Sequence, residues 1–297
     1  MSTNKYSLKK PRKILLVGGS GFIGTNIITK FTEYKVGDIL NLDKKNASLG
    51  IKTKYVDLQE PIFSEIQRFN PDNIIYLASL SENSCDDIKK ARTINVNGLS
   101  SLLQELVEYT GLKSFIYLSD YRLYKDNVPF TEASNILPSN NYLQTKLEAE
   151  QLLLKHQEEY GLPVLILRVS SLYGPFFNLN YYNFLTSTLL QAVKNQTIEV
   201  LDNNIYDYLY ISDLVSSIIA SFETNYTGVL NIGSGIGYSN IDIAKYIADQ
   251  LKIDLNIKNN ITDNVYINNI LFAKNILGWQ PNVDIEKGIK ETIKHIE

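Results

Sequence analysis

Short apolar runs alternate with longer amphipathic stretches over the first 170 or so residues of the chain. Such runs suit strands that are buried on both faces, as in a parallel sheet covered by helices. They are KILLV (13–17), DILNLD (38–43), NIIYLA (73–78), SFIYLS (114–119) and VLILRV (164–169). Between them the pattern predicts helices over 86–109 and 141–160, the second ending at Gly161 and Pro163. Strands and helices in this alternation predict a doubly wound parallel α/β sheet.

Beyond about residue 170 the alternation weakens, and loops rich in Asn and Tyr separate shorter elements. We therefore expect one domain over 12–170 and a smaller C-terminal substrate-binding lobe over 171–297. The lobe would lie at the carboxyl edge of the sheet, where ligands of such folds bind. The segments YDYLYI (206–211) and GVLNIG (228–233) are expected to add strands to the main sheet.

The composition is that of an ordinary globular chain, with 297 residues, 44% hydrophobic residues and a formal net charge of -3. Proteins that bind nucleic acid usually carry a basic surplus, so we expect no nucleic-acid partner. One cysteine, Cys85, excludes an internal disulfide, and two histidines leave few ligands for a metal, so no metal site is expected. No apolar run reaches the roughly 18 residues of a membrane span. The run behind the basic N-terminus is too short for a signal peptide, so we expect a cytoplasmic protein without a membrane partner.

A glycine-rich turn follows the first predicted strand directly. Gly18, Gly21 and Gly24 are spaced three residues apart in GGSGFIG (18–24), and an amphipathic stretch follows. Glycines at this spacing suit a tight turn, a close approach of the backbone to a pyrophosphate, and a close contact between helix and strand. The free N–H groups of the helix would then point at the phosphates. The motif predicts a dinucleotide site of the Rossmann type; the alternative is a glycine turn that binds no ligand.

Asp43 ends the second predicted strand, which is the position of the acid that binds the adenosine ribose in such folds. Its carboxylate would accept hydrogen bonds from the ribose hydroxyls and repel a 2′-phosphate. The sequence therefore favours NAD as the cofactor, with NADP less favoured, although Lys44 and Lys45 could weaken that preference.

Tyr and Lys lie four residues apart at three places, which are Tyr6/Lys10, Tyr121/Lys125 and Tyr142/Lys146. The first pair lies in a polar tail and the second in a loop, whereas Tyr142 and Lys146 share one face of the predicted helix 141–160. Lowering the pKa of a phenol from near 10 to about 7 takes roughly 4 kcal/mol, which an adjacent ammonium and a positively charged nicotinamide could supply. Tyr142 is thus predicted to exchange a proton with a substrate hydroxyl or carbonyl, while Lys146 also binds the nicotinamide ribose. The alternative is an accidental surface pair.

The glycine loop, the ribose acid and the helical Tyr–Lys pair together resemble the extended short-chain dehydrogenase/reductase family, and in particular its NAD-dependent nucleotide-sugar epimerase/dehydratase branch. The resemblance runs from about residue 12 to 290 and includes DL (57–58), TINVNG (93–98), LRVSSLYGP (167–175), GVLNIGSG (228–235) and ILGWQP (276–281). It implies that Asp57 contacts the adenine and that Asn95 lies on the helix beneath the active site. The implied cofactor-binding residues are Gly18, Gly21, Phe22, Ile23, Gly24, Asp43, Asp57, Leu58, Ala78, Asn95 and Lys146.

The chain departs from this family on the substrate side. The family's Ser/Thr, which polarises the reacting oxygen, is replaced by Asp120 in an ungapped alignment. An alignment on Ser-Asp-Tyr instead resembles the Thr-Asp-Tyr of deoxysugar 4-keto reductases and gives that role to Ser119, which we favour because a carboxylate would repel an oxyanion. The dehydratase pattern Thr-Asp-Glu is absent. Ser171 stands for the usual Asn, and Tyr206 replaces an arginine that often binds the nucleotide diphosphate, so both are expected to contact substrate.

The resemblance implies an enzyme whose candidate catalytic residues are Tyr142, Lys146, Ser119 and Asp120. The expected substrate is a nucleoside-diphosphate sugar, and the expected reaction is reduction of a 4-keto-6-deoxyhexose at C4. A nucleotide-sugar 4-epimerase that retains its NAD is the alternative within the family. A dinucleotide-binding sensor or scaffold without catalysis is the alternative from another class, and the altered Ser/Thr and arginine positions favour it. Relatives pair through the helices that correspond to 86–109 and 141–160, so a homodimer is also implied.

Overall fold

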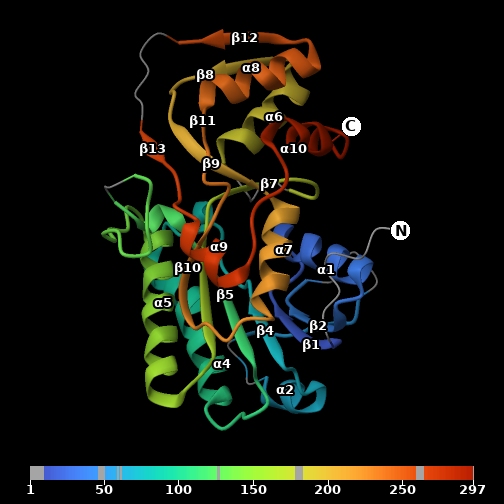
Figure 1. Cartoon of the computed structure of the whole chain (residues 1–297), viewed down its shortest axis with the longest axis vertical. Coiled ribbons are helices and arrows are strands. Elements are labelled where there is room, and N and C mark those ends of the chain that lie inside the picture. Colours follow the sequence, from blue (N-terminus) through green and yellow to red (C-terminus); the bar gives the residue numbers. More distant parts are fainter. Residues whose placement is uncertain are drawn as a thin grey trace.

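The computed structural model describes residues 10–45, 51–58, 60, 62–125, 128–177, 183–258 and 264–296, and within them the apolar runs form one parallel sheet. Its strands are β1 (Arg12–Val17), β2 (Gly37–Asp43), β3 (Thr53–Tyr55), β4 (Asn73–Tyr76), β5 (Ser114–Asp120), β6 (Val164–Val169) and β10 (Gly228–Ile232). They lie in the order β10-β6-β5-β4-β1-β2-β3 (Figure 1). The chain order reverses between β1 and β4, and folds of this kind bind ligands in the crevice at that reversal. The doubly wound α/β sheet expected from the sequence is confirmed.

The sheet is buried on both faces. In β1, Ile14 and Leu16 belong to one hydrophobic cluster, Leu15 and Val17 belong to another, and all four are 0% exposed. This arrangement explains why the strand is apolar at consecutive positions instead of alternate ones.

Helices cover each face of the sheet. The first cluster contains buried side chains of α1 (Phe22–Tyr34), α7 (Ile211–Ser221) and α9 (Leu271–Leu277). The second contains those of α2 (Phe63–Phe69), α4 (Gly98–Leu106) and α5 (Asn141–Tyr160). The bounds of α5 agree with the sequence prediction, and its C-terminus is capped by Gly161 in the left-handed conformation, at φ 69°.

The helix predicted over 86–109 is divided. It begins at α3 (Ile88–Arg92), capped by the Asp87 side chain, continues through a wide π-helical turn (Thr93–Asn97), and ends with α4. Asn95 lies in that turn, where its buried amide accepts a hydrogen bond from Leu80 N and donates one to Thr145 Oγ1. The interruption therefore coincides with a side chain that joins the β4 loop to α5.

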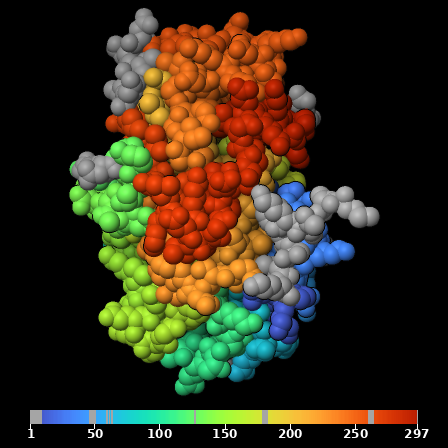
Figure 2. Space-filling model, in the orientation of Figure 1, coloured from blue at the N-terminus to red at the C-terminus, as the bar shows by residue number. Residues whose placement is uncertain are grey.

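A second group of elements lies beyond the carboxyl edge of the sheet. Strands β7 (Ser171–Tyr173), β11 (Gly237–Ser239) and β13 (Val265–Tyr266) pair with β9 (Ile205–Tyr210), and β8 (Thr197–Val200) pairs with β12 (Asp254–Ile257). Helices α6 (Phe184–Asn195), α8 (Asn240–Leu251) and α10 (Ile285–Ile293) share a hydrophobic cluster with residues of β7, β8, β9, β11 and β12. Figure 2 shows the orange and red surface of the C-terminal part running from this upper group down over the sheet-bearing half.

The two segments expected to extend the main sheet behave differently. Segment 228–233 does so as β10, which pairs with β6. The expectation for 206–211 is wrong, because β9 pairs with β7 in the smaller sheet. The chain leaves the main sheet at Ser170, directly after β6, and the next strand, β7, is the one with which β9 pairs. Over the described part of the chain, no helix is both long enough and apolar enough to cross a membrane.

Candidate active site

The glycine turn between β1 and α1 is shaped by close contacts. Gly18 has a φ of 85°, and a Cβ there would lie 2.5 Å from the backbone nitrogen of Ala78, at the end of β4. A Cβ on Gly24 would collide with the backbone of Gly19. At Gly21, by contrast, a Cβ would meet nothing within 4 Å. Gly21 is the N-cap of α1, so the turn leaves open space where the helix N–H groups point, as a bound phosphate requires.

A cavity of about 540 Å³ begins at this turn and runs across the ends of β1, β2 and β4. Nine of the predicted cofactor-binding residues line it, namely Gly18, Gly21, Phe22, Ile23, Gly24, Asp43, Asp57, Leu58 and Ala78. Asn95 does not line this cavity, and its amide holds the loop after β4, as described above. The last of the predicted set, Lys146, lies in an adjoining cavity.

Asp43 lies at the end of β2 and faces the glycine turn. One of its oxygens accepts a hydrogen bond from Ser20 N at 2.8 Å, and the other accepts one from Lys45 N at 3.0 Å. Lys44 forms an ion pair with Asp57 at 2.8 Å. An elongated cavity with a helix N-terminus at one end and a carboxylate at the side matches the outline of a dinucleotide, so these residues fit NAD.

The second cavity, of about 290 Å³, adjoins the first, because Ile23, Leu77, Ser79 and Ser81 line both. It contains all the predicted catalytic and substrate-binding residues, which are Ser119, Asp120, Tyr142, Lys146, Ser171 and Tyr206. Tyr206 stacks on Tyr266, with ring centroids 5.2 Å apart, and Ser171 hydrogen-bonds the hydroxyl of Tyr121 at 3.0 Å.

Tyr142 and Lys146 lie on the first turns of α5. The Lys146 ammonium is buried, donates a hydrogen bond to the Leu118 carbonyl at 3.0 Å, and lies 5.6 Å from the centroid of the Tyr142 ring. Burial lowers the pKa of Lys146 to about 8, against the attraction of Asp120 and Glu150. This lysine is therefore charged at neutral pH and close enough to stabilise a Tyr142 phenolate.

The Tyr121/Lys125 spacing does not form such a pair. Tyr121 lies in the 3₁₀ turn η3 (Tyr121–Leu123), and Lys125 lies beyond that turn and is exposed. Tyr6 lies outside the described residues.

Ser119 and Asp120, at the end of β5, differ in how their oxygens are used. The Ser119 hydroxyl is buried and finds no hydrogen-bond partner within the described ranges of the chain. Both oxygens of Asp120 accept hydrogen bonds from the Arg122 guanidinium, at 3.1 and 2.8 Å. Within the described residues the Ser119 hydroxyl is thus available to donate to a developing oxyanion, whereas the Asp120 oxygens are engaged by Arg122.

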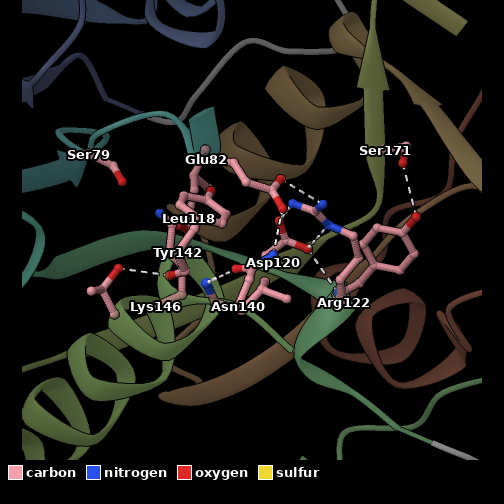
Figure 3. Close-up of polar contacts among 12 residues, drawn as sticks. Ser79, Glu82, Leu118, Asp120, Arg122, Asn140, Tyr142, Lys146 and Ser171 are labelled. Carbon is pink, nitrogen blue, oxygen red and sulfur yellow. Dashed lines mark hydrogen bonds and ion pairs between the residues drawn. The ribbon is translucent and has the colours of Figure 1, made fainter. Parts of the chain in front are cut away.

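Sequence reasoning missed two residues of this cavity, Glu82 and Arg122, and a third, Asn140, that contacts one of them. Arg122 bridges Asp120 and Glu82, and the Asn140 side chain donates a hydrogen bond to Glu82 at 2.6 Å (Figure 3). Arg122 follows the Ser-Asp-Tyr segment in the sequence, but Glu82 comes from the 3₁₀ turn η1 (Glu82–Ser84), distant along the chain, and no motif marks it.

A glycine turn at the reversal of a doubly wound sheet, with a Tyr–Lys pair in the adjoining cavity, defines the class of extended short-chain dehydrogenases/reductases. A family model for the NAD dependent epimerase/dehydratase family matches residues 14–233. The chain belongs to this family of NAD-dependent enzymes that act on nucleotide sugars.

Individual relatives show the range of the family. UDP-glucuronic acid decarboxylase 6 of Arabidopsis thaliana is 26% identical over 96% of this chain and 89% of its own length. The structure of a UDP-glucose 4-epimerase of Thermotoga maritima with UDP-glucose matches with a TM-score of 0.85 at 22% identity, covering 95% of this chain and 98% of that one. A Bacillus cereus UDP-glucuronic acid 4-epimerase, in complex with UDP-glucuronic acid and NAD, matches with a TM-score of 0.84 at 20% identity over the same fractions. At these identities the solved structures establish the fold alone.

Proposed function

We propose that the protein is an NAD(H)-dependent oxidoreductase that reduces a nucleoside-diphosphate 4-keto-6-deoxyhexose at C4. The observation that carries this proposal is the continuity of the two cavities, the second of which contains Tyr142, Lys146 and a Ser119 hydroxyl that has no partner among the described residues. The ion pair between Lys44 and Asp57 supports NAD over NADP. It neutralises one of the two lysines that could attract a 2′-phosphate, while Asp43 still faces the position of the ribose.

In this reaction the bound dinucleotide supplies the hydride. The Ser119 hydroxyl donates a hydrogen bond to the C4 oxygen as negative charge develops there, and the Tyr142 hydroxyl delivers the proton that completes the alcohol. The Lys146 ammonium stabilises the tyrosinate that remains, until solvent returns its proton.

The described charged residues of the second cavity disfavour a 4,6-dehydration. That reaction needs a base to remove the proton at C5, next to the C4 carbonyl. The two carboxylates in the lining, Asp120 and Glu82, are both bonded to Arg122 and are not free to act as that base.

A second candidate is a nucleotide-sugar 4-epimerase with retained NAD. Asp43 favours it, since a ribose held by this acid suits a tightly bound NAD, and epimerases occur among the similar structures. It would use the same Tyr142 and Lys146, with the hydride taken and then returned to the opposite face of the sugar.

The cofactor released by denaturing freshly purified protein separates the two candidates. Stoichiometric NAD, identified by mass spectrometry, supports the epimerase, whereas an empty protein that binds NADH from solution supports the reductase. The Tyr142→Phe variant tests catalysis itself: we expect turnover to fall by about 10²–10⁴-fold while NADH affinity stays within twofold of wild type. Full turnover in this variant excludes Tyr142 as the acid. Binding of dinucleotide without binding of any nucleotide sugar supports the non-catalytic alternative.

A further inference from the structure

Three charged side chains form a closed cluster beside Tyr142 in the second cavity. Arg122 donates from Nε and Nη2 to Asp120, at 3.1 and 2.8 Å, and from Nη1 to Glu82 at 2.8 Å. Its guanidinium carbon lies 6.0 Å from the centroid of the Tyr142 ring. Figure 3 shows the Arg122 guanidinium directed at both carboxylates. We call Glu82, Asp120 and Arg122 the carboxylate clamp.

Glu82 is fixed from a second direction. Its other oxygen accepts a hydrogen bond from Asn140 Nδ2 at 2.6 Å. Asn140 is also the N-cap of α5, since its side-chain oxygen accepts from Leu143 N at 2.9 Å. Displacing Glu82 would thus break its contact with Arg122 and disturb the cap of the helix that carries Tyr142.

The clamp has a formal charge of minus one, because two carboxylates surround one guanidinium. Burial by itself would lower the pKa of Arg122, but Asp120 and Glu82 outweigh that effect and raise it well above its ordinary range. An arginine has five N–H donors, and the contacts to the carboxylates use three of them, so those that remain can donate to a neutral hydroxyl. A substrate carboxylate beside these side chains would instead be repelled by two carboxylates and attracted by only one guanidinium.

We propose that the carboxylate clamp selects for nucleotide sugars whose sugar ring is uncharged and rejects those that carry a carboxylate on the sugar. This inference rests on the proposed function, because it assumes that the sugar lies against Tyr142. The other cation of the cavity lining described here, Lys146, is directed at the tyrosine, because its ammonium donates to the Leu118 carbonyl and lies 5.6 Å from the centroid of the Tyr142 ring. The clamp thereby separates this protein from a uronic-acid-processing enzyme built on the same scaffold.

The test begins with the wild-type protein loaded with NAD. Isothermal titration calorimetry with the uridine, thymidine, cytidine, guanosine and adenosine diphosphate derivatives of glucose identifies the nucleotide that binds. The glucuronic acid derivative of that nucleotide is then titrated, since it differs only by a carboxylate in place of the C6 hydroxymethyl group. We expect it to bind at least about tenfold more weakly. Equal or tighter binding of the glucuronic acid derivative overturns the proposal. If NAD binds but none of the glucose derivatives does, the proposed function fails and this inference falls with it.

The variant Glu82→Gln makes the clamp neutral at constant size. We expect it to improve the affinity for the glucuronic acid derivative by several-fold, with the affinity for the glucose derivative within threefold of wild type. Glu148→Gln is the matched control, because it removes the same charge from the surface pair that Glu148 forms with Arg92 on the outside of α5. An unchanged preference in Glu82→Gln rejects Glu82 as the determinant. If that variant does not fold, the wild-type comparison decides alone.

Discussion

At the scale of single residues, Lys146 combines a functional requirement with an energetic cost. Its ammonium is buried, and burial lowers its pKa from 10.5 to about 8. A base with a lowered folded pKa destabilises the fold at neutral pH, by an amount of the order of 3 kcal/mol. Replacing the lysine would leave the Leu118 carbonyl without this donor, which costs about 1 kcal/mol. In the proposed reaction this charge stabilises the Tyr142 phenolate.

We therefore expect Lys146→Met to remove activity and yet to unfold at a higher urea concentration than wild type. The expected gain in unfolding free energy is about 1–2 kcal/mol at pH 7. The gain should depend on pH. Between pH 8 and 10.5 the folded lysine is neutral while the unfolded one is still charged. The stability of the wild type therefore rises over this range, and the difference in unfolding free energy between Lys146→Met and wild type becomes smaller. Urea unfolding at pH 7, 8 and 9.5 measures this.

The control for this prediction is Lys155→Met on the same helix. Lys155 is exposed over 64% of its side chain and contacts Glu159 at 3.8 Å, so its replacement should leave the unfolding free energy close to wild type at each pH. A Lys146→Met variant that is less stable than wild type at pH 7, or a gap that widens with pH, would contradict the account of burial.

At the scale of elements, the position of α5 depends on a buried ion pair. Arg168 of β6 donates to both oxygens of Glu150 on α5, at 3.0 and 2.5 Å, and the two side chains are 4% and 2% exposed. The guanidinium carbon also lies 4.8 Å from the centroid of the Tyr124 ring. The pair therefore fixes α5, and with it Tyr142, to the strand next to β5.

Glu150→Gln should cost about 3–5 kcal/mol of unfolding free energy, because it leaves the Arg168 charge buried without its counter-charge. Glu148→Gln, two residues earlier on the same helix, should cost far less, since the side chains of the Arg92–Glu148 pair are 47% and 22% exposed and water screens their charges. Chemical denaturation of the two variants in parallel measures the difference. Similar midpoints for both would show that the buried pair is not what holds the helix.

The elements could be predicted from the sequence where burial leaves a local pattern. The main-sheet strands are apolar at consecutive positions because both faces are covered, and α5 has a clear cap at each end. The sheet that receives β9 could not be predicted, because strand pairing depends on contacts distant in the sequence. The carboxylate clamp could not be predicted for the same reason, because Glu82 and Arg122 come together only when β4 and β5 lie side by side. The glycine loop and the Tyr142–Lys146 pair were visible because each lies within a few consecutive residues.

At the scale of the whole molecule, Asp207 joins the smaller sheet to the main one. This carboxylate on β9 is 0% exposed and accepts hydrogen bonds from Ser234 N and Oγ, both at 2.7 Å, and from Gly235 N at 3.0 Å. It also accepts from Asn268 N at 3.4 Å, and the Asn268 side chain donates to the carbonyls of Arg168 on β6 and Ile232 on β10. Tyr206, the neighbour of Asp207, lines the second cavity. The same residue thus fixes the substrate side of the cavity to the sheet that carries Ser119.

Asp207→Asn keeps the shape of this side chain but turns one acceptor oxygen into an NH₂ group that faces backbone donors. We expect a loss on the order of 3 kcal/mol in unfolding free energy, together with faster hydrogen exchange at the Ser234 and Gly235 amides. Asp242→Asn, at an exposed position in the first turn of α8, is the control and should change neither quantity appreciably. If the Asp207→Asn variant keeps wild-type exchange at those amides, the two sheets are held together by apolar packing instead of this carboxylate.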